Sequence, residues 1–263
     1  AVYVAGANRS GQLGLGDLVP RERFVVIPET RGAGVCFVAA GYDISFAITE
    51  DHDVLSWGGK GTGADGHRIN SDFYDDDAEA YLEPKPIQDL VGEEVNQIQT
   101  GSSHCLAASK GGDVYVWGRG NCGQLGLGNY ESKQTPVLLA GLPHGADVSQ
   151  VAVGENHSLA LTRAGEVFSW GHGDRGRLGV GASQRMGVPD TERSYFPTPM
   201  ILHVFSTEVV RQVSCGPSFC LAITPSNVWA WGTGEGFVLG HGDTATRETP
   251  APIDFFKGSI VIQ

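Results

Sequence analysis

Short apolar runs with the spacing of β-strands recur along the whole chain, separated by glycine, proline and polar residues. Each run alternates apolar and small residues, and helical periodicity is absent throughout. The most regular runs end in Gly and resemble one another. They are VYVAG, VLSWG, VYVWG, VFSWG and VWAWG, at 2–6, 54–58, 114–118, 167–171 and 228–232. The pattern predicts an all-β protein built from repeats.

Up to three further segments follow these runs, in a fixed order. The first is a Gly-Leu-rich segment, at 6–17, 118–129, 171–182 and 232–243. The second is a proline-containing strand, at 24–29, 81–87, 134–139, 196–202 and 248–253. The third is a longer apolar stretch, at 37–49, 98–109, 151–162 and 213–224. Each repeat of roughly 50–60 residues therefore offers about four short strands, which is typical of a β-propeller blade.

One such sheet cannot bury both of its faces, so neighbouring sheets must pack together. We expect a single β-propeller region over 1–263. Its units are expected at 2–53, 54–113, 114–166, 167–227 and 228–263, the last of them incomplete. The recurring residues are interpreted as core or turn positions. They are Trp57, Trp117, Trp170 and Trp231 as large apolar side chains, and Gly128 and Gly181 as turn glycines.

The motif order resembles the repeats of the regulator of chromosome condensation family. The resemblance is carried by the GQLGLG segments at 11–16 and 123–128, the Trp-Gly pairs, and the Gly-x-x-His stretches that end in His104 and His157. It covers nearly the whole chain, although 58–69 lacks the GQLGLG core. Members of the family usually have seven blades. The chain is therefore expected to be a partial segment of a seven-bladed propeller. A small propeller that closes irregularly is the alternative.

The charge balance narrows the class of partner. The chain has 18 basic and 30 acidic residues, for a formal net charge of -12. Direct binding to nucleic acid is not expected, because it depends on basic side chains that neutralise phosphate. Membrane insertion is not expected either, because no long apolar run occurs. An acidic surface favours a protein partner with basic patches.

The cysteines and short motifs give no sign of covalent catalysis. The five cysteines are odd in number and lack zinc-like spacing, which favours a reducing intracellular location, cytoplasmic or nuclear. No G-x-S-x-G, GxxxxGK[ST] or HExxH motif occurs. We therefore expect no covalent enzyme, no cofactor and no metal site.

Several residues are candidates for contact with a partner. At the Gly-x-x-His position, His104 and His157 either satisfy a buried hydrogen bond or, as the resemblance implies, contribute to a GTPase-binding face. The resemblance also marks Asp174 as a candidate acidic contact, although its GHGDRG context is an ordinary turn as well. An acidic insertion at 60–83 resembles a wedge that the family's exchange factor uses, and it is otherwise a solvated loop. Its candidate residues are Tyr74, Asp75, Asp76 and Asp77.

Two functions follow from the resemblance. The first is a protein–protein interaction scaffold that binds its partner through loops on one propeller face. The alternative is a guanine-nucleotide exchange factor for a Ran-like small GTPase, associated with chromatin if the full protein carries a basic tail. Exchange needs no covalent step, since tighter binding of the nucleotide-free GTPase weakens its nucleotide by linkage.

Overall fold

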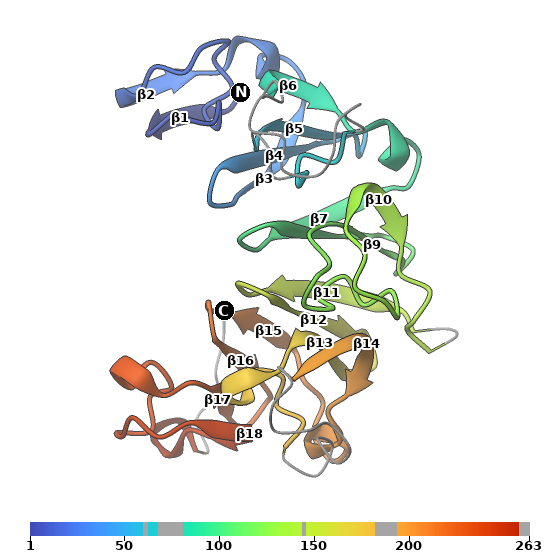
Figure 1. Cartoon of the computed structure of the whole chain (residues 1–263), viewed down its shortest axis with the longest axis vertical. Helices are drawn as coiled ribbons and strands as arrows, with labels where there is room; N and C mark the ends of the chain where they lie inside the picture. The colour runs from blue at the N-terminus through green and yellow to red at the C-terminus, as the bar shows by residue number, and fades with distance from the viewer. Residues whose placement is uncertain (60–62, 68–80, 144–145, 182–193, 258–263) are drawn as a thin grey trace. The chain divides into compact units, whose positions relative to one another are not determined.

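A computed structural model describes residues 1–59, 63–67, 81–143, 146–181 and 194–257. The chain forms two compact units. Unit 1 comprises residues 1–119 and 132–138, and unit 2 comprises residues 120–131 and 139–263. Each unit is built from short antiparallel strands, drawn as arrows in Figure 1. The prediction of an all-β protein with four-stranded sheets is confirmed.

Unit 1 holds three sheets. The first is a two-stranded sheet of β1 (Tyr3–Gly6) and β2 (Arg21–Val26). The second, a four-stranded sheet, consists of β3 (Val35–Ala40), β4 (Ile44–Thr49), β5 (Val54–Gly58) and β6 (Tyr81–Pro86). The third, also four-stranded, consists of β7 (Val95–Thr100), β8 (His104–Ser109), β9 (Val114–Gly118) and β10 (Lys133–Leu138).

Unit 2 holds two four-stranded sheets. One consists of β11 (Val148–Val153), β12 (His157–Thr162), β13 (Val167–His172) and β14 (Tyr195–Ile201). The other consists of β15 (Gln212–Cys215), β16 (Phe219–Ile223), β17 (Val228–Gly232) and β18 (Arg247–Pro252). In every four-stranded sheet the strands lie side by side in chain order, so each pairs with its sequence neighbour.

In the described part of the chain, the helical segments are single 3-10 turns, and they occur at two kinds of place. One kind follows the last strand of a sheet: η1 (Pro28–Thr30), η2 (Gln88–Leu90), η5 (His203–Phe205) and η7 (Asp254–Phe256). The other lies in a loop after a third strand: η3 (Asp174–Gly176) and η6 (Glu235–Phe237). Among the described residues, no helix has the length and apolar character needed to cross a bilayer.

The proline-containing runs at 81–87, 134–139, 196–202 and 248–253 form fourth strands, and each fourth strand is an edge of its sheet. The run at 24–29 differs, because it lies at the end of β2 in the two-stranded sheet and its Pro28 belongs to η1. Pro84, Pro136 and Pro250 lie in β6, β10 and β18. An edge strand has one side with no ladder partner, so proline costs no ladder hydrogen bond when it faces that side. Proline therefore marks where each sheet ends.

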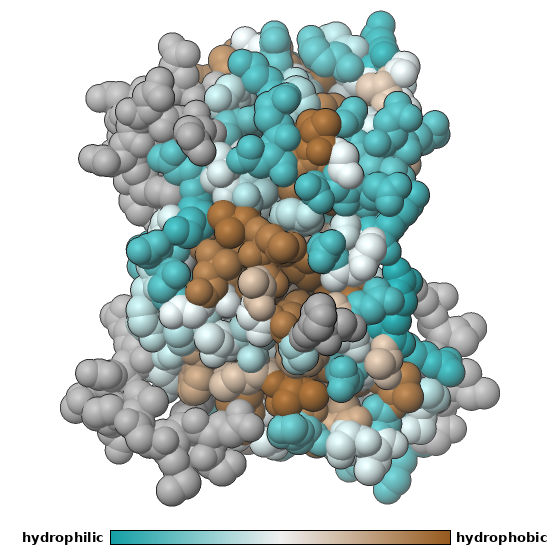
Figure 2. Space-filling view, turned by 90° about the vertical axis from the view of Figure 1, so that its right-hand side faces the viewer, coloured by the Kyte–Doolittle hydropathy of each residue, from teal (hydrophilic) through white to brown (hydrophobic). Residues whose placement is uncertain are grey.

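Neighbouring sheets within a unit pack face to face over shared cores. In unit 1, one apolar cluster joins Phe46 and Ile48 of β4 to Ile98 of β7 and Trp117 of β9. In unit 2, a second cluster joins Leu159 of β12 to Val213 of β15 and Trp231 of β17. The surface in Figure 2 is mixed, with apolar side chains gathered in places among hydrophilic ones.

The sequence repeats are offset from the sheets by half a sheet. The expected unit boundaries at 54, 114, 167 and 228 are the first residues of the third strands β5, β9, β13 and β17. A repeat such as 54–113 therefore supplies the last two strands of one sheet and the first two of the next. Each repeat thus ties two sheets together covalently.

Candidate partner-binding loops

The candidate residues gather at one end of the sheets. In an antiparallel sheet, the turn between the first and second strands and the loop between the third and fourth strands leave at the same end. We call this the loop end of each sheet. The Gly-x-x-His turns lie there, at 41–43, 101–103, 154–156 and 216–218, together with the Gly-Leu-rich loops. His104, His157 and Asp174 lie at loop ends, as do the described residues 63–67 of the insertion.

Loops that follow a third strand, and the equivalent loop after β1, bind the tryptophan of the next sheet by a hydrogen bond. The backbone oxygen of Gln12 accepts hydrogen bonds from Trp57 Nε1 at 2.9 Å and from Ser45 Oγ at 2.9 Å. The oxygen of Gln124 accepts from Trp170 Nε1 and Ser158 Oγ, both at 2.9 Å.

The same arrangement recurs at the other two tryptophans. Trp117 donates to Ala64, and Trp231 donates to Arg177, at 2.8 and 3.0 Å. All four anchor tryptophans are at most 1% exposed. The turn glycines Gly128 and Gly181 have φ of 78° and 73°. These residues therefore position the loops by packing and hydrogen bonding.

His104 and His157 are buried at the first positions of β8 and β12, with an exposed fraction of 0% each. The ring of His157 lies against Gly154, where an added Cβ would come within 2.0 Å of the ring. Phe219 has the same relation to Gly216, at 2.2 Å. The glycines at 154 and 216 thus make room for a ring. Direct contact of either histidine with a partner stays a prediction.

Asp174 lies at the loop end of the β11–β14 sheet, and its side chain is 43% exposed to solvent. It lies 2.8 Å from His172 Nε2, and Tyr195 packs edge-on against that imidazole at 5.2 Å. Burial opposes ionisation of Asp174, but the hydrogen bond and charge of His172 outweigh it and hold the carboxyl pKa below its usual value. Asp174 therefore presents a fixed negative charge to solvent.

Sequence reasoning missed an aromatic residue at the loop end of the β3–β6 sheet. Tyr42 lies in the turn at 41–43 and is 88% exposed. Its neighbour Asp43 accepts a hydrogen bond from the backbone of Gly59 at 2.8 Å, and burial raises the pKa of the Asp43 carboxyl. The available signal was the aromatic residue itself, since the matching turn positions hold Ser102, Glu155 and Pro217.

A second missed group lies where the acidic insertion begins. Asp65 is 6% exposed, and burial raises its pKa to about 6. Burial, with the charge of Lys85, lowers the pKa of His67 to about 4. His67 Nε2 lies 2.9 Å from Ser56 Oγ, and its ring packs against Tyr81 at a tilt of 55°, with the ring centroids 4.4 Å apart. Tyr74, Asp75, Asp76 and Asp77 of the insertion lie outside the described residues.

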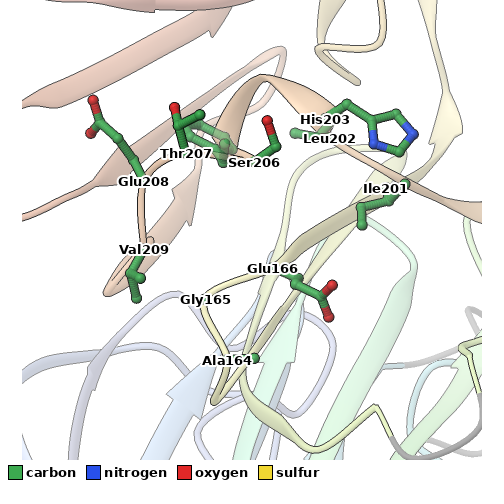
Figure 3. Close-up of a pocket in the computed structure, with 11 residues that line it drawn as sticks. Ala164, Gly165, Glu166, Ile201, Leu202, His203, Ser206, Thr207, Glu208 and Val209 are labelled. Carbon is green, nitrogen blue, oxygen red and sulfur yellow. The ribbon is translucent and has the colours of Figure 1, made fainter.

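A cleft of about 440 Å³ lies at the opposite end of the β11–β14 sheet. The turn Ala164–Glu166 forms one wall, and residues 201–209 form the other. Figure 3 shows Glu166 on the turn and Glu208 on the facing segment. None of the candidate residues from the sequence lines this cleft.

The four-stranded sheet repeats along the chain, and within each unit a loop of one sheet accepts a hydrogen bond from the tryptophan of the next. These features define a β-propeller domain of the repeat type. The chain belongs to the RCC1-like domain family, whose model matches residues 1–263. The family resemblance found in the sequence is confirmed.

Relatives with known names share about a third of the residues. The human E3 ubiquitin-protein ligase HERC2 is 34% identical over 269 residues, which cover 99% of this chain and 5% of HERC2. The ultraviolet-B receptor UVR8 of Arabidopsis thaliana is 34% identical over 254 residues, covering 95% of this chain and 52% of UVR8. The chain thus spans about half of UVR8 and a small part of HERC2.

Solved structures share the fold. Human WBSCR16 superposes with a TM-score of 0.78 at 28% identity, covering 96% of this chain and 61% of that one. Yeast RCC1 (Prp20), solved bound to Kap60, has a TM-score of 0.78 at 23% identity, covering 95% and 56%. At that identity the yeast likeness shows the fold alone.

Proposed function

We propose that this chain is a protein-interaction domain that binds its partner through the loop ends of its sheets. The observation that carries the proposal is Tyr42, an aromatic side chain left 88% exposed on a turn held by a rigid sheet. Aromatic side chains on rigid supports supply much of the binding energy at protein interfaces.

The charge of the chain and of its loop ends favours a basic partner. The formal net charge is -12, and Asp174 adds an ionised carboxylate at a loop end. Complementary charge speeds association and excludes partners of the same sign. The proposed partner therefore brings basic side chains, with an apolar or aromatic pocket for Tyr42.

The test is quantitative recovery of cross-linked partners with the whole chain as bait. Tyr42→Ala is expected to reduce recovery of the principal partner at least about tenfold, the usual loss at an interface hot spot. The matched control is Phe255→Ala. Phe255 is also aromatic and 85% exposed, but it lies in η7, at the opposite end of its sheet. Equal recovery with both variants would place the interface elsewhere.

The finer hypothesis is nucleotide exchange on a Ran-like small GTPase. It is supported by the family and by Asp174, which is exposed at a loop end. A structural study of the related yeast Prp20p describes its binding properties toward Gsp1p and histones, which is a property of that protein. Exchange would require preferential binding of the nucleotide-free GTPase and no covalent step.

Release of a fluorescent GDP analogue from a panel of small GTPases, Ran included, tests this hypothesis. The chain is expected to accelerate release from one of them, and Asp174→Asn to reduce the acceleration. Asp147→Asn is the matched control. Asp147 is also exposed and paired with a cation, Arg163, at 2.9 Å, but it lies at the opposite end of the same sheet. If the chain accelerated release from none of the GTPases, the exchange hypothesis would be wrong and only the interaction function would remain.

A further inference from the structure

Among the described residues, one group of histidine and cysteine side chains brings three metal-ligand atoms within 4.8 Å of one another. Its members are His157 at the start of β12, Cys215 at the end of β15 and Cys220 in β16. His157 Nε2 lies 3.1 Å from Cys220 Sγ, and Cys215 Sγ lies 3.5 Å from Cys220 Sγ. His157 is far in sequence from the two cysteines, and it meets them only where two sheets of unit 2 pack.

The positions of the three side chains are set by backbone geometry. Cys215 and Cys220 are direct partners across the β15–β16 pair. In the adjacent pair, next to the turn, the backbone N–H of Gly216 donates to the backbone oxygen of Phe219 at 2.9 Å. Hydrogen-bonded and non-hydrogen-bonded pairs alternate along an antiparallel ladder, so the two cysteines form a non-hydrogen-bonded pair, in which the side chains lie closer together. The ring of His157 is fixed by its contact with Gly154. The donors are thus held in place before any ligand arrives.

The fold does not require this chemistry. At the position of Cys220, other sheets have Ser45 and Ser158, whose hydroxyls make the same hydrogen bond to a loop carbonyl. At the position of Cys215, other sheets have Ala40, Thr100 and Val153. Phe219 replaces histidine in the last described sheet. The three metal-ligand side chains therefore occur together at positions that hold other residue types in the other sheets.

We propose that His157, Cys215 and Cys220 form a zinc site that ties the β11–β14 sheet to the β15–β18 sheet. Two thiolate sulfurs and one imidazole nitrogen are a donor set that Zn²⁺ prefers. Donors around a tetrahedral Zn²⁺ are separated by roughly 3.5–3.8 Å. The distances between these donor atoms need only small side-chain adjustments to match.

The charges of the site suit a buried metal. His157 and Cys220 are both 0% exposed, while Cys215 is half-buried and leaves an approach for the ion and for a fourth, water ligand. Zn²⁺ with two thiolates is neutral, so burial costs little. Burial holds the pKa of the free Cys220 thiol well above its usual value, despite the opposing charge of Arg177. Zinc must displace thiol protons, so its affinity should rise with pH.

The test is titration of the whole reduced, metal-free chain with Co²⁺, followed by displacement with Zn²⁺. We expect one Co²⁺ per chain, thiolate-to-cobalt absorption, full displacement by Zn²⁺, and a melting temperature that rises with Zn²⁺. His157→Phe, Cys215→Val and Cys220→Ser each introduce the residue that another sheet has at that position, so the fold should persist. Each is expected to weaken metal affinity at least about tenfold, since each removes a direct ligand.

The matched control is Cys105→Ser. Cys105 is the counterpart of Cys220 in unit 1, with a thiol that donates to Ala64 at 3.5 Å. This variant should bind metal as the unsubstituted chain does. Absence of thiolate-to-cobalt absorption would exclude the zinc site, as would metal binding that is unchanged in all three site variants. It would also be excluded if the chain bound Cu⁺ but not Zn²⁺, or if the purified chain contained a Cys215–Cys220 disulfide.

Discussion

At the residue scale, burial decides whether an aspartate side chain is ionised or favours its neutral form. Asp174 and Asp65 both follow a third strand, yet Asp174 is ionised in solvent beside His172, whereas Asp65 is buried. A buried carboxyl favours its neutral form, because desolvation penalises the charge. The two residues look alike in the sequence, and only their surroundings in the structure distinguish the exposed carboxylate from the buried one.

Asp65→Asn is expected to stabilise the chain above neutral pH and to have little effect near pH 4. The pKa of Asp65 rises from 3.8 to about 6 on folding, so the folded state binds the extra proton between these values. Stability from this group is complete below pH 4 and is lost as pH rises through 6, by about 2–3 kcal/mol. The asparagine variant does not undergo this loss.

Urea denaturation of both proteins between pH 4 and 8 measures the effect. The difference in unfolding free energy should grow with pH and level off above about 7. Asp51→Asn, which removes an exposed carboxylate from a turn of the same unit, is the control and should show no such trend. A difference that does not change with pH would mean that Asp65 is not buried in solution.

At the scale of elements, the Gly-Leu-rich loop is the joint between sheets. The glycine that follows its leucine packs against the indole of the next sheet's tryptophan. At Gly14, Gly126 and Gly179, an added Cβ would come within 2.7–2.8 Å of the indole. All three glycines also have φ between 66° and 73°, which favours glycine. The loop therefore depends on glycine for both its backbone conformation and its packing.

Gly14→Ala is expected to destabilise unit 1 by roughly 2–4 kcal/mol, from left-handed strain and overpacking against Trp57. Gly32→Ala is the matched control, since Gly32 has φ of 76° but no atom within 4 Å of the added Cβ. The control should cost only about 1 kcal/mol of strain. Chemical denaturation, followed by tryptophan fluorescence, measures both. Equal losses of unfolding free energy in the two variants would show that Gly14 is not packed tightly against Trp57.

At the scale of the whole molecule, the offset between repeats and sheets makes neighbours depend on one another. The repeat 54–113 supplies strands to two sheets, and the loop of one sheet holds the next. In repeat proteins, the free energy of unfolding is approximately the sum of the intrinsic stabilities of the repeats and the interaction energies between neighbours. A destabilising substitution in one sheet is therefore expected to destabilise the adjacent sheet as well, and more distant sheets less.

Amide hydrogen exchange of the Gly14→Ala variant tests this dependence. Protection is expected to fall most in β3–β6, whose Trp57 is affected, less in β7–β10, and least in β15–β18 of unit 2. Trp231→Phe, which removes a hydrogen bond within unit 2, should give the reverse gradient. An equal fall in every sheet would instead indicate that the chain unfolds as one cooperative body.

Much of the fold was open to prediction because its signals are local. Alternating apolar positions marked the strands, proline marked the edge strands and the tryptophan anchors marked the buried third strands. The candidate site was less accessible. Placing His104 and His157 at a loop end needed only the repeat, but their complete burial depends on which faces of neighbouring sheets meet. Tyr42 was missed because its exposure is likewise a property of packing.

The sequence by itself determined the repeated sheets, their order along the chain and the family, because strand period, turn glycines and edge prolines act over a few neighbouring residues. Only the tertiary structure decided which polar groups are available and which are enclosed. It left Tyr42 and Asp174 exposed, enclosed Asp65, and brought His157 together with Cys215 and Cys220. Such meetings join residues distant in sequence, and only the packing of one sheet on another creates them.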